Sequence, residues 1–309
     1  MRLRVEEADM EKKPTFRELL KNEQLFAPCV YDCMTARASE LCGYHAMMLS
    51  GGAIAYSQDG LPDMAFATID EVVWAIERIT NISKYPLIAD ADDGYGESPV
   101  VVYRNMYRVA KAGAMGLTLD DSTGIRGFER MHSKKPRTGW GVVPKEVWLA
   151  KIKAALAACE GSDCVVIARI HVPMHTPDGF KEAIDRALRA QDLGAEMIML
   201  GTHNMDFGTR VAKYVKGWKM WPDIFSINGV PNCNLDEIDK MGYRFVTMHL
   251  FEKAIMYGMM KYGTNNRKNG NPVFSATHDM NGVPELAKQM QIVNNYEKWF
   301  EFEQDCKNL

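Results

Sequence analysis

The sequence predicts an α/β fold in which eight parallel strands close into a (β/α)₈ barrel of the TIM type. Short apolar runs alternate with amphipathic segments along the chain. The runs are rich in Val, Ile, Leu and Met, as in strands that are buried on both faces. The 309 residues exceed the roughly 250 that such a barrel needs. An open doubly wound sheet is the alternative, but no GxGxxG motif follows the first predicted strand.

Each predicted strand is an apolar run bounded by polar or turn-forming residues. The eight runs are residues 26–30, 46–50, 86–91, 116–120, 164–169, 197–201, 223–227 and 244–248. Apolar residues recur at helical spacing between these runs, which predicts the helices that cover a parallel sheet. The clearest predicted helices are residues 69–82, 99–112, 144–158, 178–193 and 205–215.

The C-terminal part of the chain is predicted to be separate from the barrel. We place the barrel at residues 1–262 and a helical extension at residues 263–309. The extension begins with a polar, turn-rich stretch at 265–271, and residues 283–302 predict one or two helices that expose Tyr296, Trp299 and Phe300. A helix this apolar is expected to pack on its own barrel or on a neighbouring subunit.

Composition excludes several classes of protein. Hydrophobic residues make up 47% of the chain and charged residues 25%, so a disordered chain is excluded. The formal net charge of -3 and the absence of a long apolar run argue against nucleic acid or a membrane as a partner. The seven cysteines include no CxxC pair and no secretory signal is visible, so we expect free thiols, several of them in the core, and a cytoplasmic location.

Acidic residues follow several of the predicted strands, where the active site of a parallel barrel lies. Asp90 and Asp92 end the third strand and, being two apart, point the same way. Asp63 follows the second strand and Asp120 ends the fourth. Carboxylates that converge on one rim repel one another without a cation, and oxygen ligands suit Mg²⁺ or Mn²⁺. The alternative is structural, because Asp and Gly are also common in βα turns and as helix caps.

Five short segments carry a more specific signal. They are LSGG at 49–52, GLPD at 60–63, DADDGYG at 90–96, LDD at 119–121 and AR at 168–169. In this order they resemble the isocitrate lyase/phosphoenolpyruvate mutase superfamily, nearest to its 2-methylisocitrate lyase branch, over residues 26–262. The resemblance implies a (β/α)₈ barrel whose last helix swaps onto a partner subunit, usually in a homotetramer built as a dimer of dimers.

The same resemblance implies a magnesium site. Asp90 would bind Mg²⁺ directly, and Asp63, Asp92 and Asp120 would hold its water ligands. The superfamily usually has Glu at the position of Asp120. In the superfamily the ion stabilises negative charge on the oxygen of an α-oxo acid or product enolate while the neighbouring bond breaks.

Substrate-binding residues are implied at two strand ends. Ser50, Gly51 and Gly52 would bind a substrate carboxylate through a hydroxyl and backbone N–H groups, and glycines permit the close approach. Arg169 would clamp the same carboxylate with its planar guanidinium group. The structural alternatives are a tight turn at residues 50–52 and an ion pair between Arg169 and a rim aspartate.

One loop departs from the superfamily pattern. Lyases of the superfamily carry a K(K/R)CGH motif whose Cys serves as acid or base, and the comparable stretch here has Arg126 and Phe128 at the Lys and Cys positions. Glu129 and His132 are then the loop's candidates for proton transfer. The basic stretch 129–141 is expected either to close over an anion as a lid or to remain a solvated surface loop.

Two histidines and one asparagine complete the predicted site. His171 follows Arg169 where lyases of the superfamily have an Asp, and His203 lies just beyond the sixth strand. We predict a catalytic role for His171 and substrate binding for His203 and for Asn228, which follows the seventh predicted strand. The alternative for His171 is a structural, hydrogen-bonded histidine.

These observations favour a Mg²⁺-dependent lyase that cleaves a carbon–carbon bond of a small 2-hydroxy or 2-oxo carboxylic acid through an enolate. An oxaloacetate-type decarboxylase or hydrolase is the first alternative, since decarboxylation needs no Cys in the lid. Phosphorus–carbon chemistry of the phosphoenolpyruvate mutase type is another. A barrel without catalysis that serves as a binding or scaffold protein is the alternative from a different class.

Overall fold

Eight parallel strands close into a barrel, as predicted, in the order β1-β10-β7-β6-β5-β4-β3-β2. The computed structural model describes residues 13–123, 141–201, 204–270, 291, 294 and 296–307. The barrel strands are β1 (Leu25–Val30), β2 (Met47–Leu49), β3 (Leu87–Asp90), β4 (Gly116–Asp120), β5 (Val165–Ile170), β6 (Met197–Leu200), β7 (Trp218–Trp221) and β10 (Tyr243–Met248). Two further strands, β8 (Ser226–Ile227) and β9 (Val230–Pro231), form an antiparallel hairpin outside the barrel.

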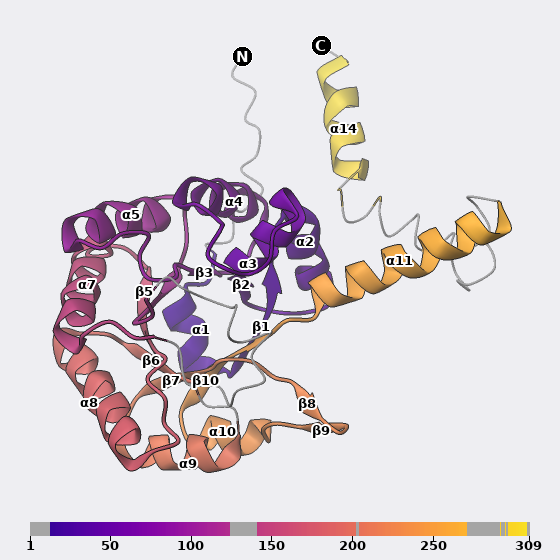
Figure 1. The fold of residues 1–309 in the computed structure, drawn as a ribbon. Helices are drawn as coiled ribbons and strands as arrows, with labels where there is room; N and C mark the ends of the chain where they lie inside the picture. Colours follow the sequence, from indigo (N-terminus) through magenta and orange to yellow (C-terminus); the bar gives the residue numbers. More distant parts are fainter. Residues whose placement is uncertain are drawn as a thin grey trace, which may run out of the picture. The chain divides into compact units, whose positions relative to one another are not determined.

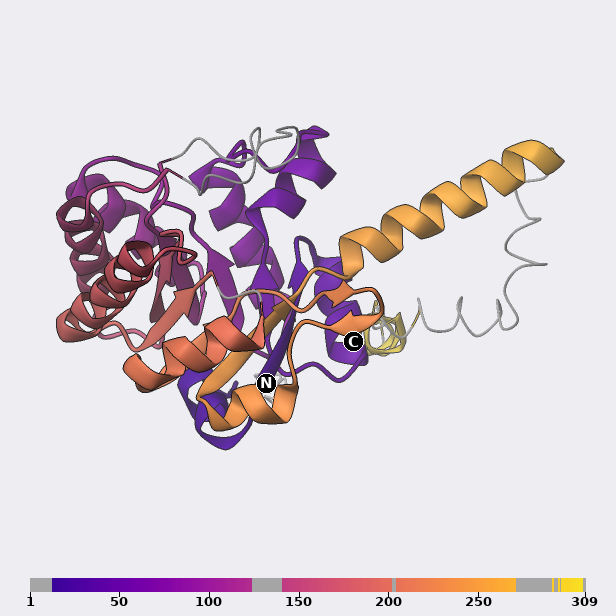
Figure 2. The ribbon, with the colours of Figure 1, turned by 60° about the horizontal axis from the view of Figure 1, so that its bottom comes forward.

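Helices surround the ring of strands in both views of the ribbon (Figures 1 and 2). Those of the barrel unit are α1 (Phe16–Asn22), α2 (Cys33–Leu41), α3 (Gly51–Ile54), α4 (Ile69–Ile82), α5 (Pro99–Lys111), α7 (Lys145–Ala158), α8 (Pro177–Leu193), α9 (Met205–Tyr214) and α10 (Leu235–Lys240), with a π-helical turn η1 (Ala55–Asp59) after α3. The helix α1 lies across the amino end of the barrel, where Phe16 and Leu20 join the core formed by the strands. That end is therefore closed by apolar side chains, and the opposite end is available for chemistry.

The five clearest predicted helices begin and end within one residue of the observed ones, and local signals explain why. α4 starts at a capping box in which the Thr68 hydroxyl accepts from the Glu71 N–H and the Glu71 carboxylate accepts from Thr68 N–H. α8 has Pro177 in its first turn and stops at Gly194, whose φ of 111° favours glycine. The apolar stripe of α4, including Val72 and Ile76, is fully buried.

The predicted seventh strand, residues 223–227, is wrong. The barrel strand is Trp218–Trp221, and residues 226–227 belong instead to the β8–β9 hairpin. The cause is Lys219, a buried lysine with 2% of its surface exposed, which interrupts the apolar run in Trp-Lys-Met-Trp. Its ammonium group leaves the core at the end of the side chain and donates to the carbonyl oxygens of Gly217 (2.8 Å) and Val215 (3.2 Å).

The second compact unit, Leu250–Leu309, contains α11 (Phe251–Asn269) and α14 (Tyr296–Lys307). The turn predicted over 265–271 is wrong for residues 265–269, because α11 runs on to Asn269 and ends at Gly270 with φ 61°. α11 also crosses residue 262, so the division at that point stays a prediction. Tyr296, Trp299 and Phe300 are exposed, as expected.

The cysteines match the expectation from composition. All seven cysteines are free thiols, and Cys29, Cys159, Cys164 and Cys233 are buried. Among the described residues, no helix combines the length and the apolar character that crossing a bilayer requires.

Lys219 gives the stability of the barrel a defined pH dependence. Burial, with a smaller effect from the charge of Lys216, lowers the pKa of Lys219 from 10.5 to about 8. Between these values the unfolded chain binds more protons than the native one, so native stability rises with pH. We expect the free energy of unfolding of the wild type to gain roughly 1–3 kcal/mol relative to Lys219→Met from pH 8 to pH 10.5. Urea unfolding across this range measures it.

Lys213→Met is the matched control, because Lys213 is an exposed lysine of the neighbouring helix α9. Its difference from the wild type should not change with pH. A constant difference for Lys219→Met as well would contradict the account of the buried ammonium group.

Candidate active site

A cavity of about 150 Å³ opens at the carboxyl end of the barrel strands. Six of the residues predicted from the sequence line it: Ser50, Gly52, Asp63, Asp90, Arg169 and His171. They come from the ends of β2, β3 and β5 and from the loops that follow β2 and β5. The barrel thus brings together side chains that are up to 121 positions apart in the sequence.

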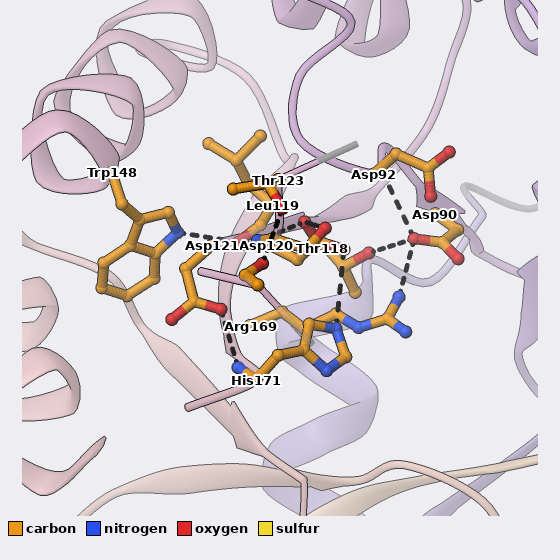
Figure 3. A network of polar contacts seen from close by, with 12 residues as sticks. Asp90, Asp92, Thr118, Leu119, Asp120, Asp121, Thr123, Trp148, Arg169 and His171 are labelled. Carbon is orange, nitrogen blue, oxygen red and sulfur yellow. Dashed lines mark hydrogen bonds and ion pairs between the residues drawn. The ribbon is translucent and has the colours of Figure 1, made fainter. Parts of the chain in front are cut away.

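Asp90 and Arg169 form an ion pair at this cavity (Figure 3). Arg169 Nη1 donates to Asp90 Oδ1 at 3.0 Å, and both side chains are less than one fifth exposed. The same oxygen accepts from the Thr118 hydroxyl at 2.9 Å and from the Asp92 N–H at 3.4 Å. Three donors from β4, β5 and the turn after β3 therefore hold one carboxylate at the cavity wall. Arg169 thus forms the ion pair that was its structural alternative, and it also lines the cavity.

Asp63 and Asp92 approach the glycines after β2. A Cβ atom on Gly52 would lie 2.7 Å from Asp63 Cγ, which real side chains do not tolerate, so glycine is required for this approach. A Cβ on Gly51 would lie 3.9 Å from Asp92 Oδ2. Asp92 is 5% exposed and has a positive φ of 48°, which is uncommon for a residue other than glycine. Asp63 lines the cavity, whereas Gly51 and Asp92 lie beside it.

Asp120 is buried behind His171. Its Oδ1 accepts from the Ser122 hydroxyl at 2.7 Å and from the Ser122 N–H at 3.1 Å. Its Oδ2 lies 3.5 Å from His171 Nε2, and Figure 3 shows the imidazole ring facing this carboxylate. A carboxylate beside an imidazole orients the ring. The ring itself is about one tenth exposed and lines the cavity.

Ser50 is the N-cap of the short helix α3. Its hydroxyl accepts from the Ala53 N–H at 3.1 Å, and Gly51 and Gly52 form the first turn. The hydroxyl proton stays available to an acceptor in the cavity. Ser50 therefore has a structural role as a helix cap, as in the alternative of a tight turn, and it also lines the cavity.

A buried ion pair supports the site by holding the backbone of one of its residues. Asp121 and Arg186 have side chains that are 0% and 5% exposed, and Arg186 Nη1 lies 3.1 Å from Asp121 Oδ2. Asp121 Oδ1 accepts from the His171 N–H at 2.7 Å, and Arg186 Nη2 donates to the Val143 carbonyl oxygen at 2.9 Å. Burial raises the pKa of Asp121 from 3.8 to about 6, while the His171 N–H and the charge of Arg186 act in the opposite direction. The pair fixes the backbone of His171.

The donor set fits a hard divalent cation that keeps most of its waters. Asp63 and Asp90 present carboxylate oxygens to one cavity, and such oxygens are the ligands that Mg²⁺ or Mn²⁺ takes. Within the described part of the chain, no three His, Cys, Asp or Glu side chains are grouped closely enough to hold a metal ion between them. A site with one direct carboxylate ligand needs no such group.

Of the remaining predicted residues, one lies away from the cavity and three fall outside the described part of the chain. Glu129, His132 and His203 lie outside the described residues. Asn228 lies in the turn of the β8–β9 hairpin, exposed and with φ 51°, and is not among the residues that line the cavity. Its placement at the cavity followed from the misplaced seventh strand, and a role for it in substrate binding stays a prediction.

Three further ionisable residues line the cavity and were not predicted: Cys29, Asp223 and His249. They stand at the end of β1 and directly after β7 and β10. A correct prediction of β7 would have pointed to Asp223, because Asp223 follows the carboxyl end of that strand just as Asp90 stands at the carboxyl end of β3. Cys29 lies in the predicted first strand, where a buried cysteine is usually a small core residue.

Comparison with known proteins agrees with the fold and the motifs. A family model described as phosphoenolpyruvate phosphomutase matches residues 16–265. A 2-methylisocitrate lyase of Salmonella typhimurium is 36% identical over 163 residues, which are 53% of this chain and 52% of that protein. The match thus spans about half the length of that relative.

Two other relatives match over more of their length. An oxaloacetate decarboxylase of Pseudomonas putida is 30% identical over 234 residues, 75% of this chain and 76% of that protein. A solved structure of 2,3-dimethylmalate lyase, itself described as a PEP mutase/isocitrate lyase superfamily member, superposes with a TM-score of 0.78 at 25% identity. It covers 94% of this chain and 93% of that one.

The Asp121–Arg186 pair makes a clear prediction. Arg186→Met leaves the buried Asp121 carboxylate without its cation, which should cost roughly 3–5 kcal/mol of unfolding free energy near neutral pH. Below about pH 6 Asp121 takes up a proton, so the loss should shrink. Urea unfolding at pH 5 and pH 8 measures both values.

Arg189→Met on the same helix is the control, because Arg189 is 61% exposed and its pairs lie at the surface. It should change stability by at most about 0.5 kcal/mol at either pH. An equal loss for Arg186→Met at both pH values would show that packing of the arginine side chain, and not its charge, is what matters.

Proposed function

The chain belongs to the isocitrate lyase/phosphoenolpyruvate mutase superfamily, and from this premise we propose that it is a Mg²⁺-dependent carbon–carbon lyase. Its substrate would be a small 2-hydroxy or 2-oxo carboxylic acid. The observation that carries the proposal is the cavity at the carboxyl end of the barrel, where Asp63, Asp90 and Arg169 meet the turn at Ser50.

The chain's own residues would divide the work between binding and proton transfer. Arg169, with Nη1 on Asp90 and its guanidinium group at the cavity, would bind a substrate carboxylate together with Ser50 and the glycines after it. Asp90 would be the direct ligand of the ion, and Asp63, Asp92 and Asp120 would orient its waters. When bound, Mg²⁺ would supply positive charge that stabilises the negative charge developing on the enolate oxygen.

His171 is the described residue of the predicted set that is best placed to move a proton. Its ring lines the cavity, Asp120 faces it at 3.5 Å, and its backbone is held by Asp121. In the cleavage direction it would accept the proton of the 2-hydroxyl group as the carbon–carbon bond breaks. Glu129, His132 and His203 remain further candidates, for proton transfer in the first two cases and for substrate binding in the third.

Decarboxylation of an oxaloacetate-like acid is the second candidate function. The Pseudomonas putida relative named an oxaloacetate decarboxylase matches three quarters of this chain. Loss of carbon dioxide leaves an enolate, as retro-aldol cleavage does, so the same cavity would serve both reactions.

We also propose that the chain works as a homo-oligomer in the cytoplasm. Tyr296, Trp299, Phe300 and Phe302 of α14 are each more than half exposed, which is unusual for one short helix. A helix that swaps between subunits would bury them. The free cysteines agree with a reducing compartment.

The metal and substrate sites are tested together by thermal unfolding. We expect Mg²⁺ with oxalate or pyruvate to raise the melting temperature by more than the sum of the two separate shifts, because both would occupy one cavity. A hundredfold excess over Kd stabilises by about 2.7 kcal/mol, which corresponds to several degrees. Asp90→Ala should lose the combined shift.

Asp70→Ala is the control, since Asp70 is an exposed aspartate of α4 that pairs with Arg108 away from the cavity. It should respond as the wild type does. A wild type that shows no coupled shift would favour the non-catalytic barrel.

Product analysis separates the two reactions. With a panel of 2-hydroxy and 2-oxo dicarboxylic and tricarboxylic acids, a lyase should release an oxo acid or aldehyde and a second carboxylic acid. A decarboxylase should release carbon dioxide from oxaloacetate. We expect the first outcome, with kcat falling by about 10²-fold or more in His171→Asn. Carbon dioxide as the sole product would replace the lyase by the decarboxylase.

A further inference from the structure

Cys29, His249 and Asp223 form a second polar group in the cavity. They stand at or just beyond the ends of β1, β10 and β7, which are consecutive strands of the closed barrel. Asp90, Asp120 and Arg169 come from β3, β4 and β5, so β2 and β6 separate the two groups on either side of the ring. The two groups therefore face one cavity from opposite arcs of the barrel.

Strand register brings the thiol and the imidazole together. β1 and β10 are parallel neighbours in which Pro28 pairs with Met248, so the next positions are Cys29 and His249. The two side chains are close enough for a hydrogen bond between thiol and imidazole to act on the pKa of His249. Cys29 is 1% exposed overall and is among the residues that line the cavity, so we place it at the cavity floor.

Asp223 holds the other side of the imidazole. Its Oδ2 lies 3.4 Å from His249 Nδ1, and its Oδ1 accepts from the His249 N–H at 3.3 Å. The loop that carries it is fixed, because Asn232 Nδ2 donates to the Asp223 carbonyl oxygen at 3.0 Å. The Thr247 hydroxyl also donates to the Pro222 carbonyl oxygen, which ties this loop to β10.

The electrostatics of this group favour a charged imidazole beside a thiolate. Burial lowers the pKa of His249, but Cys29 and Asp223 raise it more strongly, so the pKa lies well above its ordinary 6.5. A cationic imidazole in turn lowers the pKa of a neighbouring thiol, which is how reactive cysteines are formed. Among the described residues, the other ionisable groups that line the cavity are Asp63, Asp90, Arg169 and His171.

We propose that Cys29 and His249 are a proton-transfer pair of this site and that Asp223 is the positioning residue that orients the imidazole. This inference rests on the proposed function for its chemical role. The loop position at which lyases of the superfamily carry their acid–base Cys is Phe128 here. The cavity floor would supply from β1 and β10 the proton donor that this position lacks.

The proton step balances within the described residues. As the carbon–carbon bond breaks, its electron pair passes to the departing carboxylic fragment, and His171 accepts the proton of the 2-hydroxyl group. The imidazolium of His249 then gives its N–H proton to the enolate carbon and becomes neutral beside the Cys29 thiolate. Return of a proton from His171 through solvent restores the pair, so no net proton is consumed.

The first test needs no substrate. The ultraviolet absorbance of the thiolate is titrated with pH in the wild type, in Cys29→Ser and in His249→Asn, with Cys42→Ser as the control for loss of an exposed thiol. We expect a thiolate signal in the wild type well below the ordinary thiol pKa of about 8.5. The part of the signal that Cys29 contributes should be absent from Cys29→Ser, shifted to higher pH in His249→Asn and unchanged in Cys42→Ser. Cys159, whose pKa is also lowered by a hydrogen bond with Cys164, contributes equally in all four proteins.

A wild type that titrates like Cys29→Ser would overturn the pair, whatever the enzyme's reaction is. A signal that depends on both residues supports the pair even if the proposed lyase activity is not found. Failure of the inference and failure of the proposed function are thus distinguishable. Thermal unfolding of each variant checks that it is folded before its titration is read.

The second test uses the substrate that product analysis identifies. Cys29→Ser and His249→Asn should lower kcat by about 10²-fold or more, with KM changed far less, and should slow the uptake of solvent deuterium into the departing fragment. Asp223→Asn should move the pH profile of kcat to lower pH, because the imidazole loses the carboxylate that raises its pKa. Wild-type kcat and deuterium uptake in Cys29→Ser would refute the catalytic role.

Discussion

The in-register alignment of three parallel strands is the constraint on which the site depends. Asp90 pairs with Thr118 across β3 and β4, and Asp120 pairs with Arg169 across β4 and β5. Parallel strands place their carboxyl ends at one edge, so residues separated by 79 positions meet at 3.0 Å. A shift of one residue in any of these strands would turn the side chains to the opposite face and dissolve the Asp90–Arg169 contact.

A buried ion pair holds the two ends of the segment that follows β4. Arg186 reaches from α8 to Asp121 on one side of residues 124–140 and to the Val143 carbonyl oxygen on the other. The two ends of that stretch are also joined by backbone hydrogen bonds, from Thr123 N to Gly141 O and from Val143 N to Asp121 O. The anchor points of this segment are therefore fixed by the same ion pair that positions His171.

Much of the fold could be predicted because barrel strands that are buried on both faces are recognisable as apolar runs. The run at 116–120 coincides with β4, and only the strand containing Lys219 was misplaced. A single-sequence pattern treats a lysine as a surface residue, whereas here the lysine is buried and its ammonium group donates to backbone carbonyl oxygens. Because of this one lysine the seventh strand was predicted too late in the sequence. The residue expected at its carboxyl end was therefore Asn228, whereas Asp223 follows the observed strand.

The acidic residues at the ends of β3 and β4 could be predicted from the sequence, whereas the group at the ends of β1, β7 and β10 could not, for a physical reason. Asp90 and Asp92 are informative by themselves, because adjacent carboxylates at a strand end imply a cation. A cysteine such as Cys29 carries no information until its neighbour is known, since a buried thiol usually acts as a small apolar residue. Its partner His249 is 220 positions away and is set by the closure of β1 on β10. Chemistry that depends on contact between the first and last strands of a barrel is visible only after the barrel has closed.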